Sequence, residues 1–291
     1  MDTSEKINLR VSELIAKYSN SSKSIQYLLC DQYPANKLAY KIINENMEEY
    51  DLSYGELKTQ STLIANGLKQ RGIKKGDRVA TLMGKSKEYI ITLLAIWRLG
   101  AVHVPLFTAF STPAITLRVN GSNSKIVFCD QNQQSKLKPS DDFAPTGKLE
   151  VITTASFDQT PNWASRWEDL LSTDNSPEGV SCLDPEAPII HIFTSGTTGE
   201  PKGVSLPVKA LSCIEAYAEF AYDLRQTDIF WNAADPGWAY GLYCGILVTL
   251  TTGTSAILFE GGFSARTTID IIEKQKITNF AAAPTVYRSL R

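Results

Sequence analysis

Residues 194–203 read TSGTTGEPKG and combine glycines, hydroxyls and one lysine directly after an apolar run. Glycines adopt positive φ easily and let backbone N–H groups approach an anion without a Cβ in the way. The hydroxyls add donors, and Lys202 adds a mobile positive charge. The segment is therefore predicted to bind a triphosphate, with Lys202 as the candidate catalytic side chain. The candidate phosphate-binding residues are Thr194, Ser195, Gly196, Thr197, Thr198, Gly199 and Lys202.

The apolar run before this segment, residues 189–193, lies between Pro188 and the glycines and predicts a buried strand that leads into a loop. The loop is not a Walker A loop, because Lys202 is followed by Gly203 instead of Ser or Thr. An ordinary strand with a Thr/Gly hairpin remains the alternative interpretation.

In length and order, residues 194–203 resemble the phosphate-binding loop of the adenylate-forming superfamily, which includes acyl-CoA synthetases, luciferases and peptide-synthetase adenylation domains. Three further segments resemble the acetyl-CoA and medium-chain acyl-CoA synthetase branch. They are WNAADPGWAYG at 231–241, EGGF at 260–263 and APTVYR at 283–288. Residues 100–111 are similar to an early core strand of that branch and the loop after it, so the resemblance extends from about Tyr50 to the last residue.

This resemblance implies ATP-dependent activation of a short- to medium-chain carboxylic acid. The acid would attack the α-phosphorus of ATP and expel pyrophosphate, and the acyl-adenylate would then react with the thiol of coenzyme A. ATP, Mg²⁺ and coenzyme A are thus the implied cofactors. Fixed donors that face the developing charge are the main catalytic resource for such chemistry, and a mobile glycine-rich loop suits closure over ATP.

Trp238, Ala239 and Tyr240 occupy positions that resemble the acyl pocket of the branch. Tyr240 is bulkier than the small residue common in acetate-specific members, which disfavours acetate. The alternative is that the aromatic cluster around these residues is simply core. Residues 107–111 resemble a Gly-rich loop near coenzyme A, but Thr108 and Ala109 replace its glycines, which weakens that assignment.

Composition excludes several classes of protein. The chain has 291 residues, of which 43% are hydrophobic and 21% charged, which suits a globular protein with a buried core. A net charge of −2 offers no electrostatic footprint for nucleic acid. Five scattered cysteines without CxxC spacing indicate neither a disulfide framework nor a zinc site, and favour a reducing cytoplasm. His103 and His191 lie inside apolar runs, where structural positions are expected more often than ligands.

Two segments bear on membrane targeting. The N-terminus, MDTSEKINLR, has no apolar h-region, which argues against a secretory signal or a mitochondrial presequence and favours a helix. Residues 236–259 carry no charged side chain and are long enough to suggest a membrane-spanning segment. Several glycines divide this run, however, and predict a buried helix followed by a strand.

Strand-like and helix-like stretches alternate from Ser53 onward. Ser53 and Glu56 form a predicted capping box, and Ser86 is expected to open a helix that Gly100 ends. Such alternation predicts an α/β fold with two largely parallel sheets flanked by helices. The other predicted helices begin at 112 and cover 207–224 and 265–276, and the predicted strands are 78–83, 101–104, 125–129, 189–193, 228–231, 254–259 and 277–283.

A polar stretch at 172–188 predicts a connection between two sheet-forming halves, about 1–175 and 189–291. The resemblance implies that the family continues well beyond Arg291, so the chain is expected to be a partial N-terminal adenylation domain of the acyl-CoA synthetase fold, without the C-terminal domain. The motifs for adenine, metal and ribose, the hinge residue and a catalytic C-terminal lysine would lie beyond the last residue. These residues alone are thus not expected to complete turnover.

Two other functions remain open. Loss of the downstream motifs would suit a truncated protein that binds a nucleotide or a partner without catalysis. A ligase that transfers the acyl group to a carrier protein or an amine is a third interpretation, although the segments at 231–241 and 283–288 argue against it. The oligomeric state is not indicated by the sequence.

Overall fold

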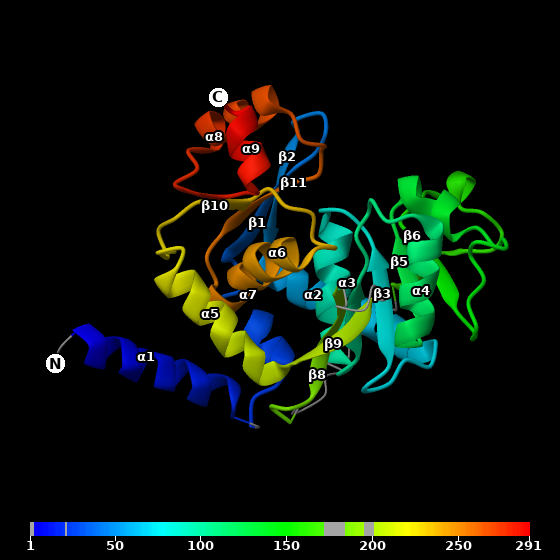
Figure 1. Cartoon of the computed structure of the whole chain (residues 1–291), viewed down its shortest axis with the longest axis horizontal. Helices are drawn as coiled ribbons and strands as arrows, with labels where there is room; N and C mark the ends of the chain where they lie inside the picture. The colour runs from blue at the N-terminus through cyan, green and yellow to red at the C-terminus, as the bar shows by residue number, and fades with distance from the viewer. Residues whose placement is uncertain (1–2, 21, 172–183, 195–200) are drawn as a thin grey trace.

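The computed structural model describes residues 3–20, 22–171, 184–194 and 201–291. Its strands form a five-stranded and a seven-stranded sheet, with helices packed on the faces of both (Figure 1). Helix α3 (Lys87–Arg98) lies between the two sheets and buries every residue from Tyr89 onward. A helix that is apolar on all sides needs this kind of enclosure. The predicted α/β architecture with two mostly parallel sheets is confirmed.

The five-stranded sheet has the strand order β12-β10-β11-β1-β2. Only the pair β1 and β2 is antiparallel, and the other neighbours run parallel. The strands are β1 (Leu38–Ile43), β2 (Glu49–Ser53), β10 (Phe230–Asn232), β11 (Ala256–Phe259) and β12 (Asn279–Ala281).

The seven-stranded sheet has the order β7-β6-β5-β3-β4-β8-β9, and only β8 and β9 pair antiparallel. Strand β4 lies beside β8 through His103 and Ile190. His103 is fully buried, and its Nε2 lies 2.8 Å from Thr81 Oγ1, as expected for a structural histidine. The strands are β3 (Arg78–Leu82), β4 (Val102–Pro105), β5 (Ile126–Cys129), β6 (Glu150–Thr153), β7 (Ser165–Arg166), β8 (Pro188–Thr194) and β9 (Lys202–Pro207).

Each sheet takes strands from both parts of the sequence. Strands β1 and β2 join the sheet of β10–β12, whereas β8 and β9 join the sheet of β3–β7. The polar stretch near residue 180 therefore does not divide one sheet from the other. The sequence analysis did not assign β1, β2 or β9, since Lys41 interrupts the apolar pattern of β1 and β9 is largely exposed.

The helices begin close to where their capping signals place them. The Ser53–Glu56 capping box is present at the start of α2, and Ser86 caps α3. At α4, Ser111 occupies the N-cap position, one residue before the expected Thr112. The helices are α1 (Thr3–Tyr18), α2 (Tyr54–Gln70), α3, α4 (Thr112–Ser122), α5 (Leu211–Phe220), α6 (Ala239–Gly241), α7 (Val248–Thr252), α8 (Ala265–Gln275) and α9 (Pro284–Ser289).

The uncharged run at 236–259 forms buried helix and then strand, as predicted. Helix α6, a π-helical stretch Leu242–Leu247 and α7 follow one another, and strand β11 comes next. Gly253 ends α7 with φ 72°, a conformation that glycine adopts without a Cβ penalty. Within the described residues, no helix combines the length and apolar content needed to cross a bilayer.

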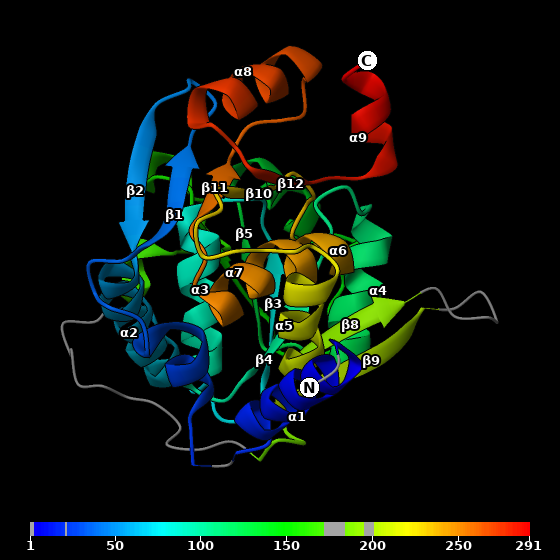
Figure 2. The same ribbon diagram turned by 90° about the vertical axis from the view of Figure 1, so that its left-hand side faces the viewer.

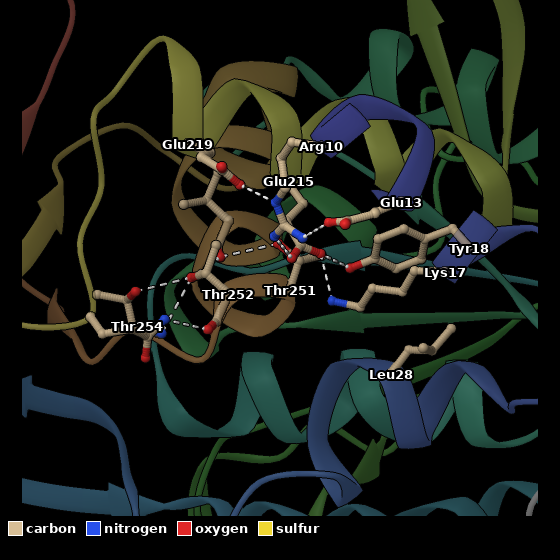
Figure 3. Close-up of polar contacts among 12 residues, drawn as sticks. Arg10, Glu13, Lys17, Tyr18, Leu28, Glu215, Glu219, Thr251, Thr252 and Thr254 are labelled. Carbon is tan, nitrogen blue, oxygen red and sulfur yellow. Dashed lines mark hydrogen bonds and ion pairs between the residues drawn. The ribbon is translucent and has the colours of Figure 1, made fainter. Parts of the chain in front are cut away.

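The N-terminal helix α1 packs against α5 through a cluster of charged side chains (Figure 3). Lys17 Nζ lies 2.6 Å and Tyr18 Oη 2.5 Å from the same carboxylate oxygen of Glu215. Arg10 Nε donates to Glu219 at 2.8 Å, one turn further along α5. Helix α5 follows β9 after one short turn. Through its contacts with α5, α1 therefore lies close in the fold to the end of the β8–β9 hairpin from which α5 continues.

Candidate functional site

The β8–β9 hairpin carries the described part of the predicted phosphate-binding segment. Thr194 and Lys202 are register partners at its end, and Thr194 Oγ1 donates to the Lys202 carbonyl at 3.5 Å. Lys202 is exposed and begins a strand, whereas the sequence had indicated a loop position. Ser195, Gly196, Thr197, Thr198 and Gly199 lie outside the described residues. The two described candidates are thus brought side by side on a hairpin that projects from the body (Figure 2).

A histidine packs across this hairpin. The Nδ1 atom of His191 lies 3.1 Å from Ser205 Oγ, and a Cβ at Gly203 would lie only 2.3 Å from His191 Nε2. Burial and the Arg78 charge lower the pKa of His191, which keeps the ring neutral at physiological pH. His191 therefore occupies a strand position with a packing role, as the sequence analysis favoured.

The segment expected to form the acid pocket lies between β10 and α6. Trp238 is 56% exposed, and its ring meets Phe107 edge-on at a centroid distance of 5.5 Å. Ala239 and Tyr240 are partly buried in the first turn of α6. Trp231, by contrast, is 1% exposed and packs in the core. The aromatic cluster of the sequence thus divides into a core tryptophan and residues that reach the surface.

Asp235 connects this segment to the loop after β4. Its Oδ1 accepts from the Gly237 N–H at 2.7 Å, and its Oδ2 accepts from Thr108 Oγ1. A Cβ at Gly237 would lie 2.3 Å from the Leu106 carbonyl oxygen, so the two loops touch through their backbones. Thr108, the departure from the glycine pattern noted in the sequence, therefore makes a specific contact with the acid-pocket segment.

A cavity of about 930 Å³ opens where the two sheets present the carboxyl ends of their parallel strands. In open α/β sheets this end is where ligands bind, because loops that leave neighbouring strands diverge there. The described residues of the β8–β9 hairpin do not line this cavity. Its charged lining consists of Glu45, Lys85, Asp130, Asp235 and Glu260, which lie in loops that follow strands, and of Glu88 in the first turn of α3.

Burial shifts the pKa values of five of these groups, and repulsion between carboxylates adds to the shift of some of them. Burial raises the pKa of Asp130 to about 6, and Glu88 and Asp235 add to the effect, while the Gly84 N–H opposes it. The pKa values of Glu88, Asp235 and Glu260 are also raised, in each case chiefly by burial. Burial lowers the pKa of Lys85, which Asp235 partly offsets. Among the described residues, five carboxyl groups and one ammonium therefore line this cavity.

Sequence reasoning missed most of this cavity, including Lys85, Asp130 and Glu260. One signal was that each of them comes within three residues of the end of a strand, at the end where ligands bind, and Glu260 also lies in the EGGF segment. Periodicity assigned several of those strands correctly, but it did not show that two different sheets would bring their ends together.

The described residues do not form a protein-built metal site, since no three His, Cys, Asp or Glu side chains among them are placed to hold an ion. Mg²⁺ commonly keeps several of its waters and binds through substrate phosphates together with few protein ligands. The described side chains by themselves therefore do not form a site that fits Mg²⁺. The four described cysteines are free thiols, and burial raises the pKa of Cys30 and of Cys129 to about 12.

Comparison with known proteins identifies relatives over nearly the whole chain. Residues 29–291 match the family described as AMP-binding enzyme. The chain is 35% identical over 274 residues to the acetyl-coenzyme A synthetase of Chlorobaculum tepidum, covering 87% of this chain and 41% of that protein. It is 30% identical over 303 residues to the acetyl-coenzyme A synthetase of a Marinomonas species, covering 94% of this chain and 45% of that protein.

A solved structure shows the same fold. The acyl-CoA synthetase of Brucella canis superposes with a TM-score of 0.87 at 35% sequence identity, over 96% of this chain and 51% of that one. The chain therefore spans about half the length, or less, of the relatives that it matches. Sequence, fold and the hairpin agree, and the chain belongs to the family of AMP-binding enzymes.

Proposed function

We propose that this chain takes part in the ATP-dependent activation of a carboxylic acid to an acyl-adenylate and in its transfer to coenzyme A. The observation that carries the proposal is the family match over residues 29–291, which includes a hairpin that presents Thr194 and Lys202 side by side. Relatives named acetyl-coenzyme A synthetase and a neighbour named acyl-CoA synthetase support the same reaction class.

The proposed phosphate-binding residues are those of the hairpin and its turn. Lys202 would neutralise charge on the β- and γ-phosphates and hold pyrophosphate as it leaves, while backbone N–H groups and hydroxyls orient the chain of phosphates. Bound with ATP, Mg²⁺ would supply further neutralisation of the phosphate oxygens. The residues proposed to bind ATP are Thr194, Ser195, Gly196, Thr197, Thr198, Gly199 and Lys202.

The proposed substrate is a short- to medium-chain acid that contacts Trp238, Ala239 and Tyr240. Trp238 and Tyr240 offer apolar ring surface near the start of α6, and Tyr240 leaves less room than a small residue would. We further propose a cytoplasmic location, because the described cysteines are free and scattered.

The phosphate-binding assignment is tested by calorimetric titration with Mg·ATP. The triple variant Lys202→Ala, Thr197→Ala and Thr198→Ala is expected to bind at least about ten-fold more weakly, the scale of losing one hydrogen bond to a charged group. Lys209→Ala is the matched control, since Lys209 is an exposed cation on the turn after β9 and pairs with Glu186. Equal affinity of the triple variant and wild type, or no affinity in wild type, would refute the assignment.

A second candidate function is nucleotide or partner binding without catalysis. Exchange of labelled pyrophosphate into ATP, measured with the full-length protein, separates the two functions. Stimulation by acids of increasing chain length supports acid activation, whereas Mg·ATP binding without exchange for any acid supports the second function. Transfer of the acyl group to a carrier protein instead of coenzyme A would be detected in a separate assay of acyl transfer from the adenylate, with release of AMP, in which the acceptor is varied.

A further inference from the structure

Lys85 stands at the carboxyl end of β3 and reaches across to the other sheet. Its Nζ donates to the Ala233 carbonyl at 3.1 Å, although the two residues are 148 positions apart. Ala233 directly follows β10. Lys85 is the one cation among the described residues that line the cavity. This lysine therefore links the loop after β3 to the first residue of the acid-pocket segment.

The same segment carries a carboxylate that attracts Lys85. Asp235 is the one charged group identified as acting on Lys85, and the attraction is mutual, because Lys85 also favours the ionised form of Asp235. Both side chains line the cavity. A largely buried ammonium that donates to a carbonyl oxygen and is attracted by a nearby carboxylate has little freedom, since leaving the carbonyl would cost solvation that the cavity walls do not replace.

Besides the Ala233 N–H, which donates to Ala281 of β12 at 3.0 Å, three contacts hold this segment from α3 and from the loop after β4. Thr108 donates to Asp235, and the Tyr89 hydroxyl donates to the Pro236 carbonyl at 3.3 Å. Gly237 lies against the backbone at Leu106. Residues 233–237 are thus seated by side chains that follow β3 and β4, and Lys85 provides the one charged contact to their backbone.

We propose that Lys85 is a positioning residue for acid selection. By fixing residues 233–237, it sets where Trp238, Ala239 and Tyr240 stand relative to the incoming acid. The expected effect on KM for the acid rests on the proposed function. The positioning of residues 233–237 by Lys85 rests only on contacts between described residues. A residue that merely stabilises the fold would affect all substrates alike, whereas a positioning residue affects the acid and spares ATP.

The test compares wild type with Lys85→Met, which keeps the length of the stem and removes the charge and the donors. The control is Lys87→Met, because Lys87 is exposed, lies two residues further on and does not line the cavity. In pyrophosphate exchange, Lys85→Met is expected to raise KM for the acid about ten-fold, as for one charged hydrogen bond, and to leave KM for ATP unchanged. Lys87→Met should match wild type in both constants.

Hydrogen–deuterium exchange of residues 233–240 provides a readout that does not depend on activity. Lys85→Met should exchange about ten-fold faster there, with the rest of the chain unchanged. If Lys85→Met has not folded, as judged by the loss of cooperative unfolding, Thr108→Val replaces it in the test. This substitution removes the donor to Asp235 and should speed the exchange of the same residues. Wild-type exchange rates in Lys85→Met, or an equal rise of KM for acid and ATP, would overturn the inference. If wild type shows no acid-dependent exchange, the proposed function fails while the deuterium measurement still decides the role of Lys85.

Discussion

Asp130 shows how a single residue can store free energy at the strand ends. Its carboxylate follows β5 and lines the cavity, and it accepts from the Gly84 N–H at 2.6 Å. Burial nevertheless dominates and raises the pKa of Asp130 from 3.8 to about 6. The ionised form is therefore less favourable in the folded protein than in the unfolded chain, a cost that binding sites commonly retain.

The pH dependence of folding stability follows from this shift. A carboxyl group whose pKa is raised by folding adds stability at low pH, and this contribution is lost as the pH rises from about 4 through about 6. Asp130→Asn keeps an oxygen to accept from Gly84, so it should stabilise the protein by about 1–3 kcal/mol at neutral pH and by much less near pH 4.

Urea unfolding of Asp130→Asn at both pH values measures this difference. Asp141→Asn is the control, because Asp141 is an exposed acid far from the cavity lining. A variant that is less stable than wild type at neutral pH would show that the contacts of the Asp130 carboxylate outweigh its burial.

At the scale of elements, α1 is held to α5 mainly by Glu215. The Glu215 side chain is 9% exposed, whereas Lys17 and Arg10 are 26% and 39% exposed. Burial and the Glu215 charge together raise the pKa of Tyr18 well above its ordinary value, so the phenol remains a hydrogen-bond donor. Residues 29–291 match the family, so α1 precedes the matched region.

Glu215→Ala should therefore destabilise the protein by about 2 kcal/mol. Removing one partner of a buried charged pair leaves the other unsatisfied, and partial exposure of Lys17 reduces the cost below that of a fully buried pair. Glu219→Ala, which removes a 39% exposed side chain from the same helix, should cost at most about 1 kcal/mol.

Thermal and urea unfolding measure the two free energies, and deuterium exchange locates the effect. Faster exchange in α1 is expected for Glu215→Ala. Equal losses of stability in both variants would mean that Glu215 contributes no more than a surface ion pair.

At the scale of the whole molecule, the two sheets are interlocked along the chain. The hairpin β1–β2 completes the sheet of β10–β12, and the hairpin β8–β9 completes the other sheet. The main core includes residues of both sheets and of α3 between them. Trp97 illustrates this, since its indole N–H donates to the Ile189 carbonyl at 2.9 Å.

A fragment of residues 1–171 should consequently fail to fold as a cooperative unit. It would keep β1 and β2 without their parallel neighbour β11, and it would expose the face of α3 that packs against β8. Circular dichroism of the fragment during heating is expected to show a broad, low-amplitude transition beside the sharp transition of the full chain. A sharp transition in the fragment would mean that the first half folds independently.

The capping signals, the buried strands and the phosphate-binding pattern could be predicted because they depend on residues close together in sequence. Ser53 and Glu56 are three residues apart, and the alternation of apolar strands with capped helices is repeated along the chain. These local signals determined the α/β class, most of the elements and the family resemblance.

The strands β1 and β9 and the cavity could not be read in the same way. Strand β9 is positioned by pairing with β8. Strand β1 is positioned by pairing with β11, which lies more than 200 residues away in the sequence. The contact of Thr108 with Asp235 joins residues 127 positions apart. Nothing in local propensity records which strands become neighbours.

The sequence by itself thus determined the chemistry that the chain can offer, because residue types and short spacings are local properties. The tertiary structure alone decided which strand ends meet, which carboxylates share a cavity and that Lys85 reaches Ala233. The physical reason is that burial and long-range pairing arise only when distant segments pack together, and packing is what shifts the pKa values of groups such as Asp130.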